Sequence, residues 1–318
     1  MNALYFDGQL SLREVPEPQP DRDEALIRTR LAGICGTDLE ILKGYSGFRG
    51  ILGHEFVGQV VGCSQARLIG RRVVGEINVT CGRCDWRRRG LRRHCLARTV
   101  MGIAGRPGAF AEFVTLPVRN LHEAPAEVPD EEAVFVEPLA AASEILEQLQ
   151  LTRGTRLAVI GAGRLGLLVA QVLRHAGGDV TLIGRSDWKL KLARSWGLKT
   201  IKLTDAQFAR RSFAVVVEAT GSPQGFRESL RLVEPRGTVV MKSTFREPAQ
   251  FDTADLVVNE ITLLGSRCGS FEAALDLLRH NAIHAEEMIS RVFPLSEGLE
   301  AFGYLESASC LKVLLRND

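Results

Sequence analysis

The sequence predicts an α/β protein of two domains, one rich in β-strands and one built on a doubly wound parallel sheet. The chain has 318 residues, which is long for a single hydrophobic core. Short β-like segments broken by Gly and Pro fill its first half, for example ALIRTRLAG and FVGQVVG. From Arg156 to about His280, apolar strands alternate with amphipathic helices, as βαβ units require.

The order of these segments predicts the domain boundaries. Residues 1–147 are expected to form the β-rich domain, residues 148–281 the parallel-sheet domain, and residues 282–318 to return to the first domain. A helix after Pro138 is expected to lead into the second domain, because proline is favoured in a first helical turn. The apolar residues that recur in it at helical spacing are Leu139, Ala142, Ile145, Leu146 and Leu149.

The second domain is expected to contain six strands. They are RLAVIGAG, DVTLIG, KTIKL, FAVVVEAT, GTVVMKS and ITLLGS, in chain order. Between the first two, a helical face is marked by Leu165, Leu168, Val169, Val172 and Leu173.

Composition excludes several classes of protein. Hydrophobic residues at 45% and charged residues at 25% are ordinary for a globular chain. The net charge of +2 gives no electrostatic reason to expect nucleic acid or a membrane as partner. The amino terminus lacks the features of a secretory signal, no apolar run is long enough to cross a bilayer, and the seven unevenly spaced cysteines suit reduced thiols. A cytoplasmic protein is therefore expected.

A glycine motif at the start of the second domain predicts a dinucleotide site. Gly161, Gly163 and Gly166 follow an apolar strand and open a helix that includes Arg164 and Leu165. The glycines permit a tight turn, close approach of the pyrophosphate and close helix packing. The alternative, a glycine-rich turn without a ligand, is disfavoured by the βαβ setting.

The residues after the second strand favour NADP over NAD. An NAD site usually has an acidic residue there, but this chain has Gly184, Arg185 and Ser186. A guanidinium and a hydroxyl suit a 2′-phosphate. The alternatives are that Asp187 binds the ribose of NAD, or that Arg185 is only a solvated residue at a helix start.

Four residues of the first domain are types that bind zinc in an open, catalytic geometry: Cys35, His54, Glu55 and Glu137. A metal beside a dinucleotide suggests hydride transfer. The alternatives are a buried core cysteine, a surface His-Glu pair, and a Glu137 that only stabilises a helix amino terminus.

Taken with their spacing, GICGTDLE, LGHEFVG, GAFAEFV, VEPLAAA and GAGRLG make the chain resemble the zinc-dependent medium-chain alcohol dehydrogenases, most closely the polyol, sugar and threonine dehydrogenases. The resemblance implies a GroES-like catalytic domain and a Rossmann domain. It also implies that Cys35 and His54 bind a catalytic Zn²⁺ directly, while Glu55 and Glu137 compete for the remaining position.

The resemblance also assigns roles to other residues. Thr37 falls at the proton-relay position, and Asp38 at the carboxylate that orients the histidine ligand. Lys312 matches a basic residue that reaches the pyrophosphate. The remaining residues expected to line the cofactor site are Ala219, Thr220, Gly221, Gly265 and Ser266.

One lobe departs from the family pattern. Many relatives hold a structural zinc with four cysteines, but here Arg87 stands in the third position, beside Cys81, Cys84 and Cys95. Arginine is not a zinc ligand, so we expect a lobe without metal, with His94 or Asp85 as the alternative fourth ligand. The lobe is also rich in arginine, which favours a solvated surface or a subunit contact over nucleic-acid binding.

These features predict a zinc-dependent, NADP-preferring dehydrogenase. Its substrate is expected to be a secondary alcohol, polyol or sugar-like, interconverted with a carbonyl. The alternatives are a metal-independent enone or quinone reductase on the same fold, a catalytically silent cofactor-binding protein, and a nucleic-acid binder that uses the arginine lobe. The resemblance favours a homodimer or homotetramer, which we expect to pair through the dinucleotide domain near VVNEITLLG, where an exposed strand edge needs covering.

Overall fold

The computed structural model describes residues 1–205, 210–245, 247–306 and 309–317. The chain divides into two compact units. Unit 1 comprises Met1–Glu137, Ala274–Arg279 and Ala285–Asp318, and unit 2 comprises Pro138–Ala273 and His280–His284. The chain therefore leaves unit 1 after Glu137 and returns to it from Ala274 onward, except for His280–His284.

Unit 1 is built on three sheets. The seven-stranded sheet has the order β11-β6-β5-β3-β19-β18, with β10 also paired to β3. Its strands are β3 (Glu24–Gly33), β5 (Glu55–Cys63), β6 (Arg72–Gly75), β10 (Phe113–Pro117), β11 (Leu121–Glu123), β18 (Ile289–Pro294) and β19 (Lys312–Arg316). The two three-stranded sheets are β2 (Leu10–Glu14), β1 (Asn2–Phe6) and β4 (Gly50–Ile51), and β7 (Asn78–Val79), β8 (Thr99–Met101) and β9 (Gly105–Arg106).

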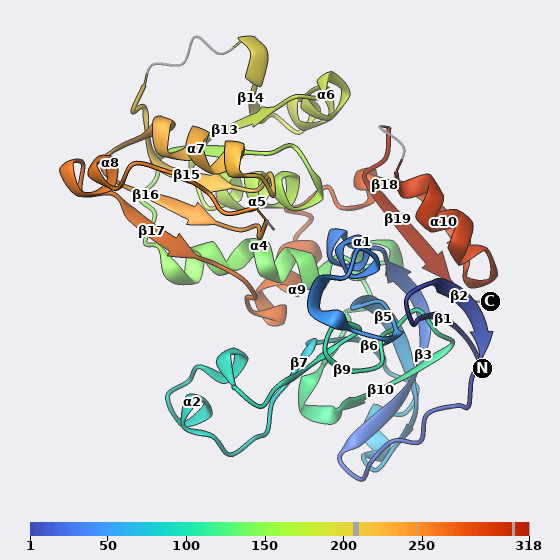
Figure 1. Ribbon diagram of the computed structural model, residues 1–318. Helices are drawn as coiled ribbons and strands as arrows, with labels where there is room; N and C mark the ends of the chain where they lie inside the picture. The colour runs from blue at the N-terminus through green and yellow to red at the C-terminus, as the bar shows by residue number, and fades with distance from the viewer. Residues whose placement is uncertain (206–209, 246, 307–308, 318) are drawn as a thin grey trace. The chain divides into compact units, whose positions relative to one another are not determined.

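β3 shows why this half of the chain forms strands. Ala25, Ile27 and Leu31 alternate with the exposed Arg28 and Arg30, so one face of the strand is buried and the other is solvated. The buried face belongs to a core that includes the large side chains Phe56, Phe110, Leu116 and Phe293. β3 lies between β5 and β19 in this sheet (Figure 1); Cys35 follows the end of β3, and Glu55 begins β5.

The helices of unit 1 are short. They are α1 (Gly36–Leu42), α2 (Asp85–Arg88), α3 (Asp130–Ala133) and α10 (Gly298–Leu305). At the start of α1, the backbone N–H of Cys35 donates to Asp38 Oδ2 at 2.8 Å. This capping arrangement satisfies a free backbone group and fixes the turn that carries both side chains.

Unit 2 contains one six-stranded parallel sheet of order β14-β13-β12-β15-β16-β17. The strands are β12 (Arg156–Ile160), β13 (Asp179–Gly184), β14 (Lys199–Lys202), β15 (Phe213–Glu218), β16 (Val233–Met241) and β17 (Thr262–Gly265). All six coincide with the predicted strands. The order reverses between β12 and β15, the switch point at which doubly wound sheets bind ligands.

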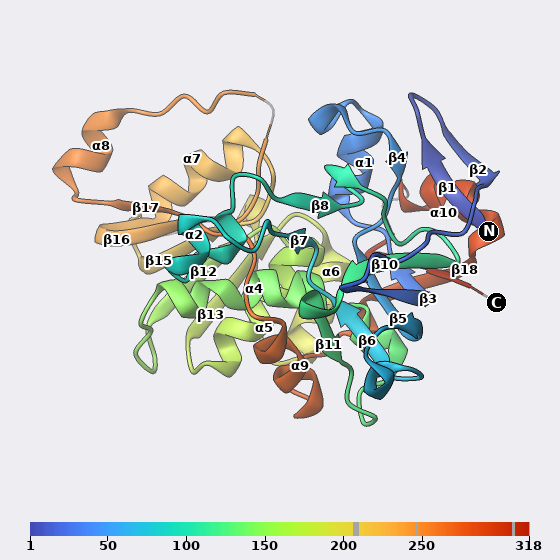
Figure 2. The same cartoon turned by 90° about the horizontal axis from the view of Figure 1, so that it is seen from below.

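Helices cover both faces of this sheet. α4 (Val136–Gln148) and α5 (Arg164–His175) lie on one face, and α7 (Pro223–Leu232) lies on the other in both views (Figures 1 and 2). The remaining helices are α6 (Asp187–Ser195), α8 (Thr253–Val258) and α9 (Phe271–Arg279). Among the described residues, no helix combines the length and the apolar character that crossing a membrane requires.

α4 explains why the observed division precedes the predicted boundary at residue 147. Lys242 Nζ donates to the carbonyl of Ala141, and Gln148 Nε2 donates to Gly265 O at 3.1 Å. These bonds tie α4 to the ends of β16 and β17. All but the first residues of the helix therefore belong to unit 2, and the division falls between Glu137 and Pro138.

Candidate active site

Three predicted zinc ligands meet in unit 1. The ligand atoms of Cys35, His54 and Glu55 all lie within 4.8 Å of one another. Strand register brings them together, because the last residue of β3, Gly33, pairs with Glu55, the first residue of β5. Cys35 follows that end of β3 at the N-cap of α1, so it comes beside Glu55 and His54, the residue just before β5. A thiol, an imidazole and a carboxylate at this separation fit an open zinc site.

Asp38 faces the histidine of this group. Asp38 Oδ1 lies 3.3 Å from His54 Nδ1, and both side chains are buried. Neither atom has a hydrogen bond of good geometry to another described residue. Burial alone disfavours a charged imidazole, but the carboxylate of Asp38 and the thiol of Cys35 raise the pKa of His54 well above its usual value. Since Asp38 faces Nδ1, the other ring nitrogen is available for a metal.

Thr37 lies next to the same thiol. Its hydroxyl oxygen is 3.8 Å from Cys35 Sγ, and the side chain is half-buried in the first turn of α1. A hydroxyl between the ligands and the surface is suited to the proton-relay role expected of it.

Glu55 also forms an ion pair with Lys312 in the interior of unit 1. Lys312 Nζ bonds to Glu55 Oε2, and each side chain is only 1% exposed. The same ammonium lies 3.5 Å from the carbonyl of Ile34. A side chain at Gly33 would overlap Glu55 Oε2, so glycine leaves the room for this ion pair. The carboxylate is thus both near the ligand group and paired with a buried cation.

Glu137 stands apart from the ligand group. It lies half-buried in the first turn of α4 and has an interaction of its own there. Among the described residues, the group of ligand atoms includes Glu55 and not Glu137. The role of Glu137 as a ligand stays a prediction.

The glycine motif of unit 2 has the backbone geometry that its sequence predicts. Gly161 has φ of +113°, and a Cβ there would lie 2.5 Å from the carbonyl oxygen of Ala219. A Cβ at Gly166 would lie 1.8 Å from Gly161 O, so only glycine allows α5 to start this close to β12. Gly163 is the N-cap of α5, and a Cβ there would meet nothing within 4 Å. This open helix amino terminus fits an anionic pyrophosphate.

Two cations lie at the ends of neighbouring strands: Arg185 follows β13, and Lys202 ends β14. Arg185 is exposed, and no ion pair of its guanidinium is found with the described residues. Asp187, the residue that favoured NAD, is paired with Lys202 Nζ at 2.7 Å. Register explains that pair, since Gly184 lies opposite Lys202. The sequence analysis missed Lys202, because only the observed register of β13 and β14 places the end of KTIK beside Asp187.

Glu218, at the end of β15, is a second buried group that the sequence analysis missed. Its carboxylate accepts hydrogen bonds from the backbone N–H of Thr220 at 2.6 Å and from Ser243 Oγ at 2.6 Å. Ser243 Oγ in turn accepts from the backbone N–H of Gly221 at 2.9 Å. This network fixes the loop Ala219–Gly221 at the switch point, where cofactor contact is predicted.

The loop after β17 is also fixed by a buried lysine contact. Ser266 is buried, and its hydroxyl lies 3.2 Å from Lys242 Nζ. The neighbouring Gly265 has open space at its Cβ position. Gly265 ends β17 at the edge of the sheet and Ser266 follows it, and their contact with a cofactor stays a prediction.

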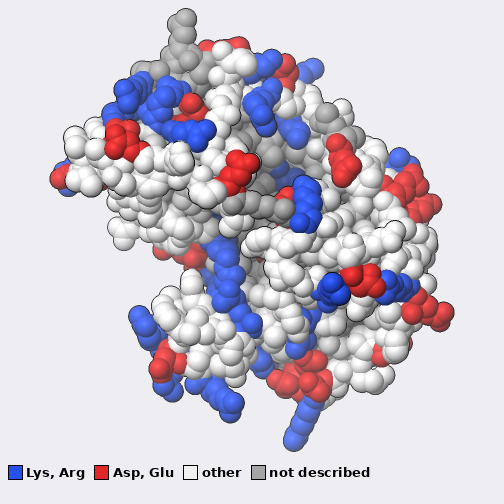
Figure 3. All heavy atoms as spheres, viewed as in Figure 1, with Lys and Arg blue, Asp and Glu red and all other residues white. Residues whose placement is uncertain are grey.

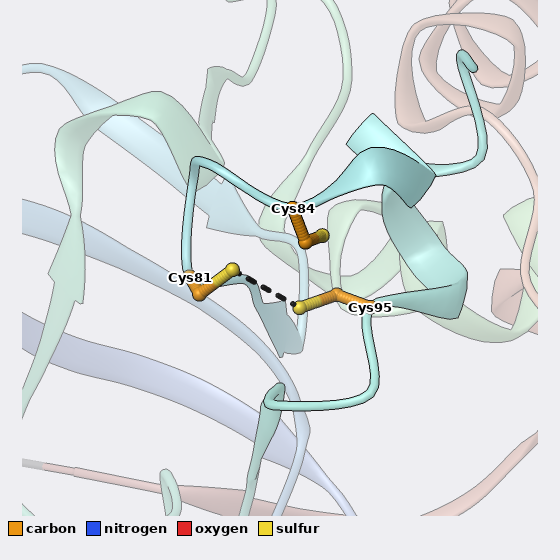
Figure 4. Close-up of side chains that lie close together, drawn as sticks. All are labelled: Cys81, Cys84 and Cys95. Carbon is orange, nitrogen blue, oxygen red and sulfur yellow. Dashed lines mark hydrogen bonds between the residues drawn. The ribbon is translucent and has the colours of Figure 1, made fainter. Parts of the chain in front are cut away.

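The lobe of unit 1 gathers three thiols. The sulfur atoms of Cys81, Cys84 and Cys95 lie within 4.8 Å of one another and point toward a common centre (Figure 4). Arg87 supplies no fourth ligand, because its guanidinium donates to Gly82 O at 2.8 Å. Asp85 is paired with Arg88, and neither Asp85 nor His94 belongs to the group. The residues present do not fit a closed, four-ligand zinc site.

The arginines around these thiols are largely engaged within the lobe. Figure 3 shows Lys and Arg side chains gathered over the segment that carries α2. Arg92 pairs with Glu76 at 2.6 Å, and the Arg89 guanidinium lies 5.0 Å from the ring centroid of Trp86. The arginines of this segment are Arg83, Arg87, Arg88, Arg89, Arg92 and Arg93.

Both halves of the chain match models of known protein families. The family model of the alcohol dehydrogenase GroES-like domain matches residues 21–126, and that of the zinc-binding dehydrogenases matches residues 165–280. A sorbitol dehydrogenase of Halalkalibacterium halodurans is 29% identical over 99% of this chain and 98% of its own. An L-threonine 3-dehydrogenase of Streptomyces avermitilis is 34% identical over 80% of each chain.

A solved structure from Sinorhizobium meliloti 1021, that of a candidate zinc-binding dehydrogenase bound to NADP, has a TM-score of 0.92 and 30% identity. The alignment covers 99% of this chain and 98% of that chain. The predicted fold class, a GroES-like β-rich domain with a Rossmann domain, is confirmed. The matched domains, the ligand group of unit 1 and the glycine turn of unit 2 identify the chain as a member of the zinc-dependent medium-chain alcohol dehydrogenase family.

Proposed function

We propose that this alcohol dehydrogenase relative is a zinc-dependent enzyme that transfers a hydride between NADP and a secondary alcohol of the polyol or sugar type. The observation that carries the proposal is the group of Cys35, His54 and Glu55, with Asp38 facing the histidine. A metal-independent reductase would have no need of this arrangement, and a buried His-Asp contact is typical of metal sites.

Cys35 and His54 would hold the zinc ion directly, with Glu55 or Glu137 as the third protein ligand. Bound zinc supplies Lewis-acid stabilisation of negative charge on the substrate oxygen. Asp38 keeps the imidazole of His54 oriented, and Thr37 accepts a proton from the substrate hydroxyl and passes it on through its own hydroxyl. Lys312 holds the carboxylate of Glu55, because the two are buried as an ion pair.

Two cations, Arg185 after β13 and Lys202 at the end of β14, support NADP as the cofactor. Arg185 and Ser186 are available to a 2′-phosphate, and Lys202 adds positive charge while it occupies the carboxylate of Asp187. A relative that is 30% identical was solved with NADP bound. The residues proposed for the rest of the cofactor are Gly161 to Gly166, Ala219 to Gly221, Gly265, Ser266 and Lys312.

The substrate class comes from the relatives. A sorbitol dehydrogenase and a threonine dehydrogenase, both acting on hydroxyl-bearing substrates by their names, align over most of this chain. We therefore propose a small polyhydroxylated or hydroxylated molecule as substrate rather than a nucleic acid.

We also propose a cytoplasmic homo-oligomer. Its seven cysteines are all free thiols, which suits a reducing compartment. β17 is paired on one side only in the part of the chain that is described, and Val257 and Val258 of the neighbouring α8 are exposed. An apolar strand edge of this kind is commonly covered by a second copy.

A turnover assay with a panel of polyols, sugars and hydroxy amino acids, each with NADP and with NAD, tests the proposal. Metal-dependent turnover of one class with NADP supports it. Reduction of enones or quinones by metal-free protein would instead establish the reductase alternative, and tight NADPH binding without turnover of any substrate would establish the silent one.

A further inference from the structure

The three thiols of the lobe are not equivalent. Cys95 is completely buried, Cys84 is partly buried at the N-cap of α2, and Cys81 is exposed. The thiol of Cys95 donates to the sulfur of Cys81 at 3.6 Å, the contact drawn in Figure 4. An exposed sulfur in contact with a buried one is the arrangement of an attacking thiol and its resolving partner.

The surroundings of the cluster favour thiol chemistry over a closed metal site. Among the described residues, the cluster has no fourth zinc ligand, since Arg87 bonds to Gly82 O and Asp85 is paired with Arg88. Gly82 has φ of +77°, so the turn between Cys81 and Cys84 is of the kind that glycine permits. What remains is a set of three reduced sulfur atoms beside several guanidinium groups.

We propose that Cys81 and Cys95 form a reversible dithiol–disulfide site that reacts with hydroperoxides. A disulfide requires a sulfur separation of about 2.05 Å, so the pair must close by roughly 1.5 Å, within reach of side-chain rotation at Cys81. The exposed position of Cys81 admits the oxidant, and the buried position of Cys95 keeps the second sulfur from reacting first.

The reaction balances with a hydroperoxide as the only oxidant. The thiolate of Cys81 attacks the terminal peroxide oxygen, the O–O bond breaks, and the alkoxide or hydroxide that leaves takes up a proton. The sulfenic acid of Cys81 is then attacked by the sulfur of Cys95, and its oxygen leaves as water with the Cys95 proton. Two thiols are oxidised by two electrons, and one peroxide is reduced to an alcohol and water.

The local electrostatics agree with this order of events. A backbone hydrogen bond from Arg83, with a further bond from the Cys95 thiol, lowers the pKa of Cys81 to about 7. A thiol with a pKa near ambient pH is the most effective attacking group. The Cys84 pKa is shifted in the opposite direction, above its usual value.

Peroxide treatment of the full-length protein tests the site. Reduced protein is exposed to one equivalent of hydrogen peroxide, the remaining thiols are blocked with a maleimide, and the products are mapped as non-reduced peptides. We expect a peptide pair joined through Cys81 and Cys95, a loss of two titratable thiols, and full reversal by dithiothreitol. Cys81→Ser and Cys95→Ser should abolish the joined pair, while Cys84→Ser, the matched control, should retain it.

Three results would overturn the proposal. The first is a dominant disulfide between Cys81 and Cys84, and the second is oxidation of Cys81 to sulfinic acid with no joined peptide. The third is zinc in the purified protein that shields the thiols from peroxide and is lost equally in Cys81→Ser and Cys84→Ser. Metal analysis of each variant before the peroxide step separates the last result from loss of the catalytic metal, since Cys35 and His54 are unchanged.

Discussion

Lys312 and Glu55 form a fully buried ion pair, although 257 positions separate them in the sequence. β3 lies between β5 and β19, and its last residue, Gly33, pairs with Glu55 on one side and with Leu314 on the other. Lys312, two residues before Leu314, therefore extends past the end of β3, where it meets Glu55. The carboxyl-terminal strand thereby fixes one member of the predicted zinc ligand group. The intact buried ion pair contributes little net stability, but removing either partner leaves the other as a buried charge without compensation, which is strongly destabilising.

Replacing the lysine tests the importance of this pair for stability. Lys312→Met should lower the free energy of unfolding by about 3–5 kcal/mol, because it leaves a buried carboxylate without its cation. Denaturant unfolding measures the change. As a control, Lys43→Met breaks an exposed pair with Glu40 and should cost less than about 1 kcal/mol.

The double variant Glu55→Gln with Lys312→Met should lose less stability than the two single variants together, since no charge is then left unpaired. Strictly additive losses of stability would contradict this description of the pair.

The single variant Lys312→Met also tests the predicted contact of Lys312 with the pyrophosphate. If that contact exists, the Kd for NADP should be higher in Lys312→Met.

Asp38 is expected to act on metal affinity. Asp38→Asn removes the charge that faces His54 Nδ1, so zinc affinity should fall by roughly 10- to 100-fold. Competition with a chromogenic chelator measures it. Asp23→Asn, which removes an exposed carboxylate of unit 1 that pairs with Arg119, should leave the affinity unchanged; an equal loss in both variants would mean that the removed charge, not its contact with His54, matters.

Arg185 is expected to set the cofactor preference. A charged hydrogen bond contributes about 1.5–3 kcal/mol, so Arg185→Ala should raise the Kd for NADP roughly 10- to 100-fold and leave that for NAD nearly unchanged. Cofactor titration by fluorescence measures both constants. Arg194→Ala, which removes an exposed arginine from the last turn of the following helix, α6, is the control. Equal effects of Arg185→Ala on the two cofactors would rule out a phosphate contact.

The thiolate of Cys81 gives a pH-dependent prediction. Because its pKa is lowered to about 7, the rate of alkylation of Cys81 by iodoacetamide should rise with pH and approach its plateau below pH 9, where an ordinary thiol is still half protonated. Mass-spectrometric quantification of the labelled peptide gives the profile. A midpoint at or above that of free cysteine would contradict the hydrogen-bonding arrangement of the lobe.

The exposed apolar residues of α8 predict the site of self-association. Val258→Arg should shift the protein to a smaller species in size-exclusion chromatography with light scattering, since a buried unpaired charge weakens an interface. Leu299→Arg changes a similarly exposed apolar residue in unit 1 and should leave the size unchanged.

Most of the fold was predictable, because its signals are local. The period of apolar residues predicted the strands of unit 2, and the motif GAGRLG predicted a turn in which a Cβ at Gly166 would overlap the carbonyl oxygen of Gly161. The predicted boundary at residue 147 differs from the observed division after Glu137. The helical pattern of α4 would be the same in either unit, and only its hydrogen bonds with Gly265 and Lys242 show that it belongs to unit 2.

The candidate site was predictable where the motifs are short. CGTD and GHE gave Cys35, Asp38, His54 and Glu55, which the register of β3 and β5 brings together. Partners from distant strands were not predictable: Lys202 meets Asp187 only through the parallel register of β13 and β14, and Ser243 meets Glu218 from a separate strand end. No local pattern contains that information.

The central claim is that Cys35 and His54 hold a metal on which alcohol oxidation depends. Turnover of the best substrate with NADP, compared among the native protein, Cys35→Ala and His54→Ala at equal folded concentration, tests it most directly. The account predicts that each variant loses at least about 100-fold in kcat/KM together with its zinc, since Lewis-acid stabilisation contributes several kcal/mol. Equal activity in all three proteins would contradict the zinc mechanism.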